Sequence, residues 1–199
     1  MPLLDKFAAG RKPRINFLEL DHQRRAMAFH EAGHAVLGML AGMRCNHTGL
    51  LSYLTPSPSG ASMATAWTGL TNWAPYHASF FDIAVAHGEA GRVAETRYLS
   101  QSGLLTALSA PDARHDRLSA AALLADVGYQ IVDMGEPAPA SGTTWEAVTI
   151  AAERRCEEEW ERITAVVDAI MAASYHTVSG DLAAAAAGIP NPPRARIAE

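Results

Sequence analysis

The pattern His30-Glu31-x-x-His34 constrains this chain more than any other feature of its sequence. The flanking residues 26–29 and 35–40 are mostly apolar, which predicts a largely buried helix. Residues four apart lie on one face of a helix, so the two histidines can bind one metal ion while Glu31 reaches its water. This pattern is typical of the zinc-binding helix of peptidases.

Two interpretations of the two histidines stay open at this point. Unpaired polar groups are costly inside a protein, so His30 and His34 need partners. A pair of hydrogen-bonded core histidines would satisfy that need without any metal. A catalytic zinc would instead take three protein ligands and leave one position for water, so a third ligand must come from a carboxylate or histidine on a later helix.

Composition excludes several classes of protein. The chain has 199 residues, 49% of them hydrophobic, and its net charge is −5 without a Lys/Arg-rich run, so we expect no nucleic-acid partner. Cys45 and Cys156 are too few for a disulfide framework, which favours a cytoplasmic location. No apolar run is long enough to span a membrane, and residues 1–5 lack the features of a signal peptide.

The order of apolar and turn-forming residues predicts a mainly α (α+β) fold. We expect an N-terminal arm over residues 1–20, a single domain over 21–185, and a flexible C-terminal tail over 186–199. Two short strands separated by a turn predict a small sheet next to the motif helix, and helical periodicity fills most of the rest. The predicted strands are 49–54 and 64–70, and the predicted helical segments are 22–41, 77–100, 111–127 and 143–175.

Several helix ends can also be predicted. Asp21 could cap the motif helix, and Gly42 is suited to end it. Pro111 fits the first turn of the third helical segment. Thr143 or Thr144 could cap the last one, whose opposite charges four residues apart indicate a solvated face.

Short stretches through most of the chain carry a resemblance to one family. They are Phe29-His-Glu-Ala-Gly-His-Ala35, Trp67-Thr-Gly-Leu70, Ala90-Gly-Arg-Val-Ala-Glu95, Ala113-Arg-His-Asp116 and Val178-Ser-Gly-Asp-Leu182. Together they resemble the peptidase domain of FtsH-type ATP-dependent zinc metalloproteases. The resemblance implies a helical, zincin-like peptidase domain with a small β-sheet or hairpin next to the metal helix.

The same resemblance implies roles for individual residues. His30, His34 and Asp116 become the ligands of a Zn²⁺ ion, and Glu31 becomes the general base. Asp112 is the rival third ligand, because it lies four residues before Asp116 and a small error of alignment would exchange the two. His115 fits the ligand pattern less well, and Glu95 could support the site from outside or form a structural ion pair. His47, Cys45, His77 and His87 are interpreted as bystanders.

The function implied is that of a zinc metalloendopeptidase acting on unfolded or flexible protein substrates, which could add to the strand at 64–70. The sequence contains no Gly-x-x-x-x-Gly-Lys-Ser/Thr loop, so any ATPase would be a separate partner, and a homo-oligomer is a further expectation. Two alternatives stay open: a regulatory zinc peptidase that cleaves a repressor, and a peptidase-like module that binds proteins without catalysis.

Overall fold

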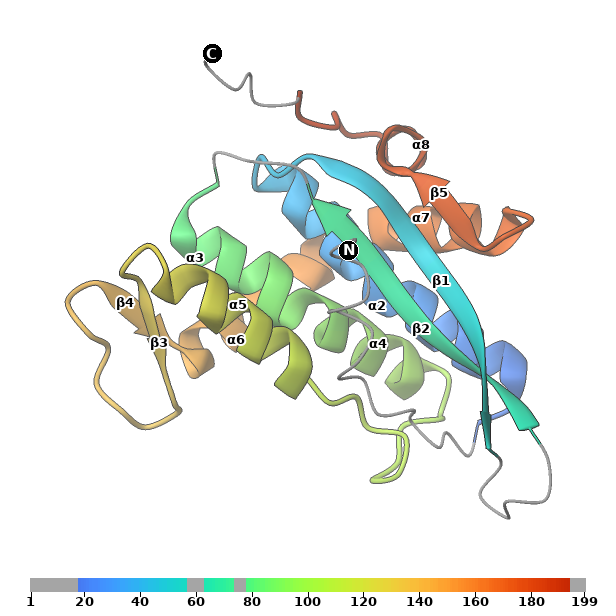
Figure 1. Cartoon of the computed structure of the whole chain (residues 1–199), viewed down its shortest axis with the longest axis horizontal. Helices are drawn as coiled ribbons and strands as arrows, with labels where there is room; N and C mark the ends of the chain where they lie inside the picture. The colour runs from blue at the N-terminus through green and yellow to red at the C-terminus, as the bar shows by residue number, and fades with distance from the viewer. Residues whose placement is uncertain (1–17, 57–62, 74–77, 194–199) are drawn as a thin grey trace.

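The molecule is built around one long buried helix, α2 (Leu20–Leu40) (Figure 1). The computed structural model describes residues 18–56, 63–73 and 78–193, so the predicted arm lies mostly outside the described residues. Every residue of α2 from Ala28 to Met39 is buried, as the apolar sequence predicted. Asp21 lies in the first turn and does not cap the helix, because α2 begins one residue before it.

Gly42 ends α2 in the way that its position predicted. It adopts a φ of 89°, which costs a glycine little, and its N–H donates to Met39 O at 3.0 Å. The N–H of Met43 donates to Gly38 O at 2.9 Å, which completes a Schellman motif. The chain therefore turns back sharply and lays the next strand along α2.

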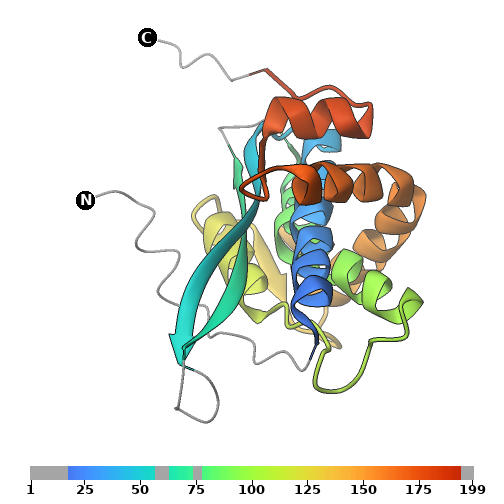
Figure 2. The ribbon, with the colours of Figure 1, turned by 90° about the vertical axis from the view of Figure 1, so that its right-hand side faces the viewer.

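A three-stranded antiparallel sheet covers one side of α2. Strands β1 (Cys45–Pro56) and β2 (Met63–Trp73) pair along their length, and β5 (Thr177–Ser179) pairs with the other edge of β1. Both predicted strands fall inside this hairpin. Figure 2 shows the hairpin along one side of α2, with α4 (Ala90–Gln101) and α7 (Trp160–Ala172) packed on the other side. The predicted α+β class with a small sheet beside the motif helix is confirmed.

The segment predicted as one helix over 77–100 has three parts. A short helix α3 (Phe80–Ile83) leads into a π-helical segment η1 (Ala84–Glu89), which continues into α4. In the π-helical part, the N–H of Ala90 donates to Val85 O instead of Ala86 O, which would be its partner in an α-helix. Apolar periodicity alone does not reveal this change of hydrogen bonding.

Two of the other predicted helix boundaries were wrong. Helix α5 (Arg114–Ala125) begins three residues after Pro111, because Asp112 Oδ1 accepts the backbone N–H of Arg114 and holds the chain in a turn. The segment 143–175 is broken at Glu159 into α6 (Trp145–Glu158) and α7, with Thr144 capping α6 through the N–H of Ala147.

The remaining elements are short. A parallel pair, β3 (Gln130–Val132) and β4 (Gly142–Thr144), was not predicted. Helix α8 (Gly180–Ala187) contains the predicted tail boundary at residue 186, and Asn191 beyond it bonds both backbone groups of Cys45. Within the described ranges, every helix is too short or too polar to cross a lipid bilayer.

Candidate metal centre

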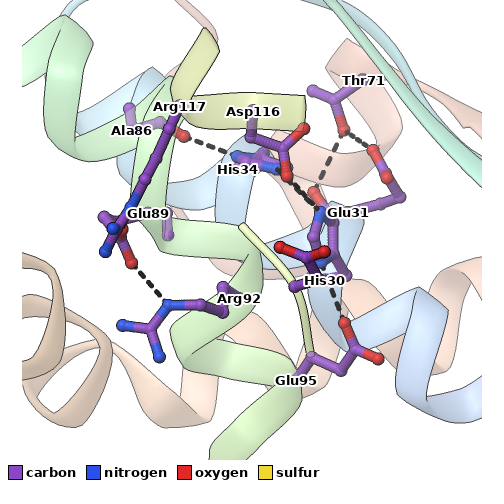
Figure 3. A network of polar contacts seen from close by, with 12 residues as sticks. His30, Glu31, His34, Thr71, Ala86, Glu89, Arg92, Glu95, Asp116 and Arg117 are labelled. Carbon is purple, nitrogen blue, oxygen red and sulfur yellow. Dashed lines mark hydrogen bonds and ion pairs between the residues drawn. The ribbon is translucent and has the colours of Figure 1, made fainter. Parts of the chain in front are cut away.

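His30 and His34 lie one turn apart on the buried part of α2 and point into the same space (Figure 3). Their exposed fractions are 4% and 6%. The Nε2 atoms of the two rings are 3.1 Å apart. The helix therefore brings two imidazole nitrogens together without help from any other element, as the spacing of the pattern predicted.

Asp116 brings a carboxylate to the two imidazoles from the first turn of α5. Its Oδ2 lies 3.1 Å from His30 Nε2 and 3.8 Å from His34 Nε2, and its exposed fraction is 8%. Within the described ranges, these three residues form the one cluster of His, Cys, Asp or Glu side chains whose ligand atoms meet closely enough to hold a metal ion.

Asp112, the rival third ligand, lies outside this cluster. Its side chain is half exposed, and its Oδ2 accepts the Nε–H of Arg114 at 2.9 Å. The fold thus places Asp116 beside the histidines and turns Asp112 toward the surface.

The three groups fit a zinc ion by donor type and by spacing. Two imidazole nitrogens and one carboxylate oxygen match a catalytic zinc site, which keeps a fourth position open. Zinc bonds of roughly 2.0–2.2 Å place neighbouring ligand atoms of a tetrahedron about 3.3 Å apart. The observed separations of 3.1, 3.1 and 3.8 Å scatter around that value, so little movement is needed to accept the ion.

Both histidines have an outer partner that orients the ring. His30 Nδ1 donates to Glu95 Oε2 at 3.0 Å, and His34 Nδ1 donates to the backbone oxygen of Ala86 at 2.6 Å. Because a carbonyl and a carboxylate only accept, each ring carries a proton on Nδ1 and directs Nε2 at the cluster. Such outer partners are typical of metal-binding histidines.

The electrostatics of the cluster favour a positive charge at its centre. Burial opposes a charged imidazole, but hydrogen bonds to Asp116 and Glu95 outweigh it and raise the pKa of His30 to about 10. Burial also opposes ionisation of Asp116, but its hydrogen bonds to the two histidines hold the pKa of that carboxyl well below its usual value. A proton on His30 thus stands where a cation would be held.

Glu31 lies next to the cluster and turns its carboxylate toward β2 (Figure 3). The side chain is buried, and the hydroxyl of Thr71 donates to its Oε2 at 2.7 Å. A Cβ added at Gly69 would overlap Glu31 Oε1, so a larger residue at that point of the strand would force the Glu31 side chain to move. The predicted general base therefore stands between the metal cluster and β2.

Gly91 is a site residue whose role the sequence did not reveal. A Cβ there would overlap His34 Nε2 and lie 2.6 Å from His30 Nε2, which is the space an ion between the two rings would need. On the facing helix, a Cβ at Gly33 would lie 2.6 Å from Ala90 O. These two glycines let α2 and α4 approach closely enough to enclose the cluster.

The residues interpreted as bystanders stay away from the cluster, apart from His77, which lies outside the described residues. His47 pairs with Ser179 in the sheet, and His87 lies in η1. Cys45 and Cys156 are free thiols, and burial raises the pKa of each to about 12, which makes them poor nucleophiles.

No protein-family model matches this chain, and no curated protein matches it in sequence. The resemblance to FtsH-type peptidases therefore stays a prediction.

Proposed function

We propose that this protein is a zinc-dependent metallopeptidase. The observation that carries the proposal is the buried convergence of His30, His34 and Asp116, with both histidines oriented from outside and Glu31 beside them. Two nitrogens and one oxygen at tetrahedral spacing leave a position for water. A structural zinc site is usually closed by four protein ligands and has no use for an adjacent carboxylate.

The chemistry follows from the three ligands and Glu31. His30, His34 and Asp116 would hold a zinc ion, which would supply a Lewis acid able to lower the pKa of water and polarise the scissile carbonyl of a peptide. Glu31 accepts the proton of the attacking water and passes it to the leaving amine. The hydroxyl of Thr71, at 2.7 Å from Glu31 Oε2, orients the carboxylate for both transfers.

The outer edge of β2 is the proposed binding site for the substrate backbone. β2 is the terminal strand of the order β2-β1-β5, and none of the described strands pairs with its second edge. Gly69 and Thr71 on this strand contact Glu31. An extended peptide added to this edge would lie beside the base, which favours unfolded or flexible substrates.

This reaction needs no ATP at the residues of this chain. By the resemblance to FtsH-type enzymes, a separate ATPase that unfolds substrates and a homo-oligomeric assembly belong to the proposal as partners. The ATPase and the assembly would affect how the substrate reaches the site, and the proton transfers at Glu31 would stay the same.

The first test is cleavage of unfolded fluorescent casein by the zinc-loaded protein without ATP. Glu31→Gln is the matched control, because it keeps the volume of the side chain and the ligands but removes the base. We expect cleavage by the natural protein and a loss of at least about 100-fold in the variant at equal zinc content. Equal activity in both would exclude Glu31 as the base.

A second candidate function is a peptidase-like module that binds proteins without catalysis. It is favoured by the direct hydrogen bond between His30 and Asp116, which satisfies both side chains without an ion. No cleavage by either protein, with or without bound zinc, would support this alternative.

A further inference from the structure

Glu89 is a completely buried carboxylate that the proposed reaction does not use. It ends the π-helical segment η1, and its exposed fraction is 0%. Arg92 Nε donates to its Oε2 at 2.6 Å, and Arg117 Nε donates to its Oε1 (Figure 3). One buried carboxylate thus joins the helix η1–α4 to α5.

Arg117 is the residue directly after Asp116. Besides Glu89, it contacts two residues of α6: its guanidinium lies 5.1 Å from the ring centroid of Trp145, and one amino group is 3.4 Å from Thr149 Oγ1. The first turn of α5 is therefore held from two other helices through a single side chain. Asp116 takes its place at the cluster from this same turn.

Stability alone does not account for a buried carboxylate with two partly buried arginine partners. Apolar residues of similar volume often replace a buried ion pair without loss, or even with a gain, in stability. A guanidinium bound to a carboxylate does fix distance and direction between two elements, because the hydrogen bonds are directional. The arrangement is therefore better suited to setting a position than to adding stability.

The π-helical segment contacts one of the three candidate ligands directly and reaches the residue next to a second one. Ala86 O accepts the Nδ1–H of His34, and Glu89 reaches Asp116 through the neighbouring Arg117. In the continuing helix α4, Glu95 accepts the Nδ1–H of His30. One continuous helix thus bonds both histidines from outside and holds Arg117, the residue after Asp116.

We propose that Glu89 and Arg117 are positioning residues of the metal centre, which hold Asp116 at the distance where it completes the site. The inference rests on the proposed metal centre. Groups that orient metal ligands typically contribute 10–100-fold to metal affinity, so we expect about that loss when the pair is broken.

The test measures zinc affinity by competition with a chelator, in a cycle of Arg117→Gln, Asp116→Ala and the double variant. If Arg117 acts through Asp116, Arg117→Gln weakens zinc binding about 10–100-fold in the natural background and has no further effect in the Asp116→Ala background. The matched control is Arg114→Gln, which removes an exposed arginine of the same turn that pairs with Asp112. We expect the control to bind zinc like the natural protein.

The cobalt spectrum gives a readout that a general loosening of the fold would not produce. With Co²⁺ at saturation, the d–d bands of Arg117→Gln should shift toward those of Asp116→Ala, while those of Arg114→Gln should not. If Arg117→Gln does not fold, Arg117→Lys, which keeps the cation, takes its place in the same cycle. Glu89→Gln tests the other member of the pair.

Two results would overturn the inference. One is an unchanged zinc affinity in Arg117→Gln, and the other is an equal loss in both backgrounds, which would mean that Arg117 acts on the whole fold. Failure of the metal centre itself looks different, because then the natural protein would not bind zinc, or Asp116→Ala would bind it equally well.

Discussion

The two sides of the candidate metal centre are built in different ways. His30 and His34 belong to one helix that is buried along most of its length, so ordinary helix geometry fixes their relative positions. Asp116 comes from α5, which buries only Asp116, Ala120 and Leu124, has an alanine at its N-cap and exposes Leu118 and Leu123. The histidine side is set by local structure, and the aspartate side by packing between helices.

The two sides should therefore respond differently to sequence changes. A change that keeps α2 helical leaves the spacing of the two histidines intact. The carboxylate depends on contacts of α5 with η1 and α6, which lie far from it in the sequence. We therefore expect the histidine side to fail only by direct obstruction and the aspartate side to fail gradually.

Gly91→Ala should have the largest effect, because it obstructs the histidine side directly. The new Cβ would overlap His34 Nε2, so we expect zinc affinity to fall by more than about 100-fold, beyond the loss typical of an outer partner. Alanine normally stabilises a helix relative to glycine by about 1 kcal/mol. A lower melting temperature of the metal-free variant would show the clash independently. Normal zinc binding by Gly91→Ala would mean that the ion does not lie between the two rings.

Asp116→Ala compared with Asp112→Ala tests the aspartate side. Asp116→Ala should lower zinc affinity by at least about 10–100-fold, the amount that outer partners of a ligand typically contribute. The zinc affinity of Asp112→Ala should stay within about twofold of that of the natural protein. Isothermal titration with zinc measures both. The reverse order would restore Asp112 as the ligand and would require α5 to shift on binding. Loss of metal in Asp116→Ala would also count against the repressor-cleaving class, whose third ligand is placed differently.

The smallest expected effect is the change with pH in the free energy of unfolding of the metal-free protein. It arises from the hydrogen bond between His30 on one side and Asp116 on the other. Since the pKa of His30 rises from 6.5 to about 10 on folding, its proton stabilises the fold fully below pH 6.5 and loses that contribution as pH rises toward 10. We expect the free energy of unfolding to drop by at least about 1 kcal/mol between pH 7 and pH 9. Urea denaturation of chelator-treated protein measures this.

The matched control for the pH experiment is Asp116→Ala, which removes one of the two carboxylates that hold the proton. The alkaline decline should be smaller in that variant. In the natural protein, zinc binding at pH 8 should release a proton, since a ligand histidine must be neutral. An equal decline in both proteins would locate the titration elsewhere.

The sequence predicted the parts of the centre that depend on short-range spacing. His30, Glu31 and His34 could be proposed as a set because helix periodicity alone brings them to one face. Asp112 and Asp116 could not be separated by the same reasoning, since they are four residues apart. The start of α5 at Arg114, where the Asp112 side chain accepts a backbone N–H, leaves only Asp116 beside the histidines. The role of Ala86 was inaccessible, because any residue offers a carbonyl.

A helix end was predicted correctly where a single residue type, glycine, favours it. A helix end was missed where charged residues of helical spacing continue on both sides of it. Gly42 ended α2 as expected because few other residues adopt its φ. The break at Glu159 was missed because opposite charges continue through it: Arg154 pairs with Glu158 four residues later, and Arg162 pairs with Glu159 three residues before it. Such exposed pairs are weak and do not decide where a helix stops.

The π-helical form of residues 84–89 makes the number of residues in this segment as important for the candidate metal centre as the identity of their side chains. A bond between residues i and i+5 spans one residue more than the α-helical bond between i and i+4, so the segment behaves like an α-helix with a single insertion. Deleting one residue, such as His87, would return it to α-helical bonding and rotate Ala86 by about 100° relative to Glu95. A chain that kept every ligand but was one residue shorter at this point would lose the alignment that no substitution elsewhere could restore.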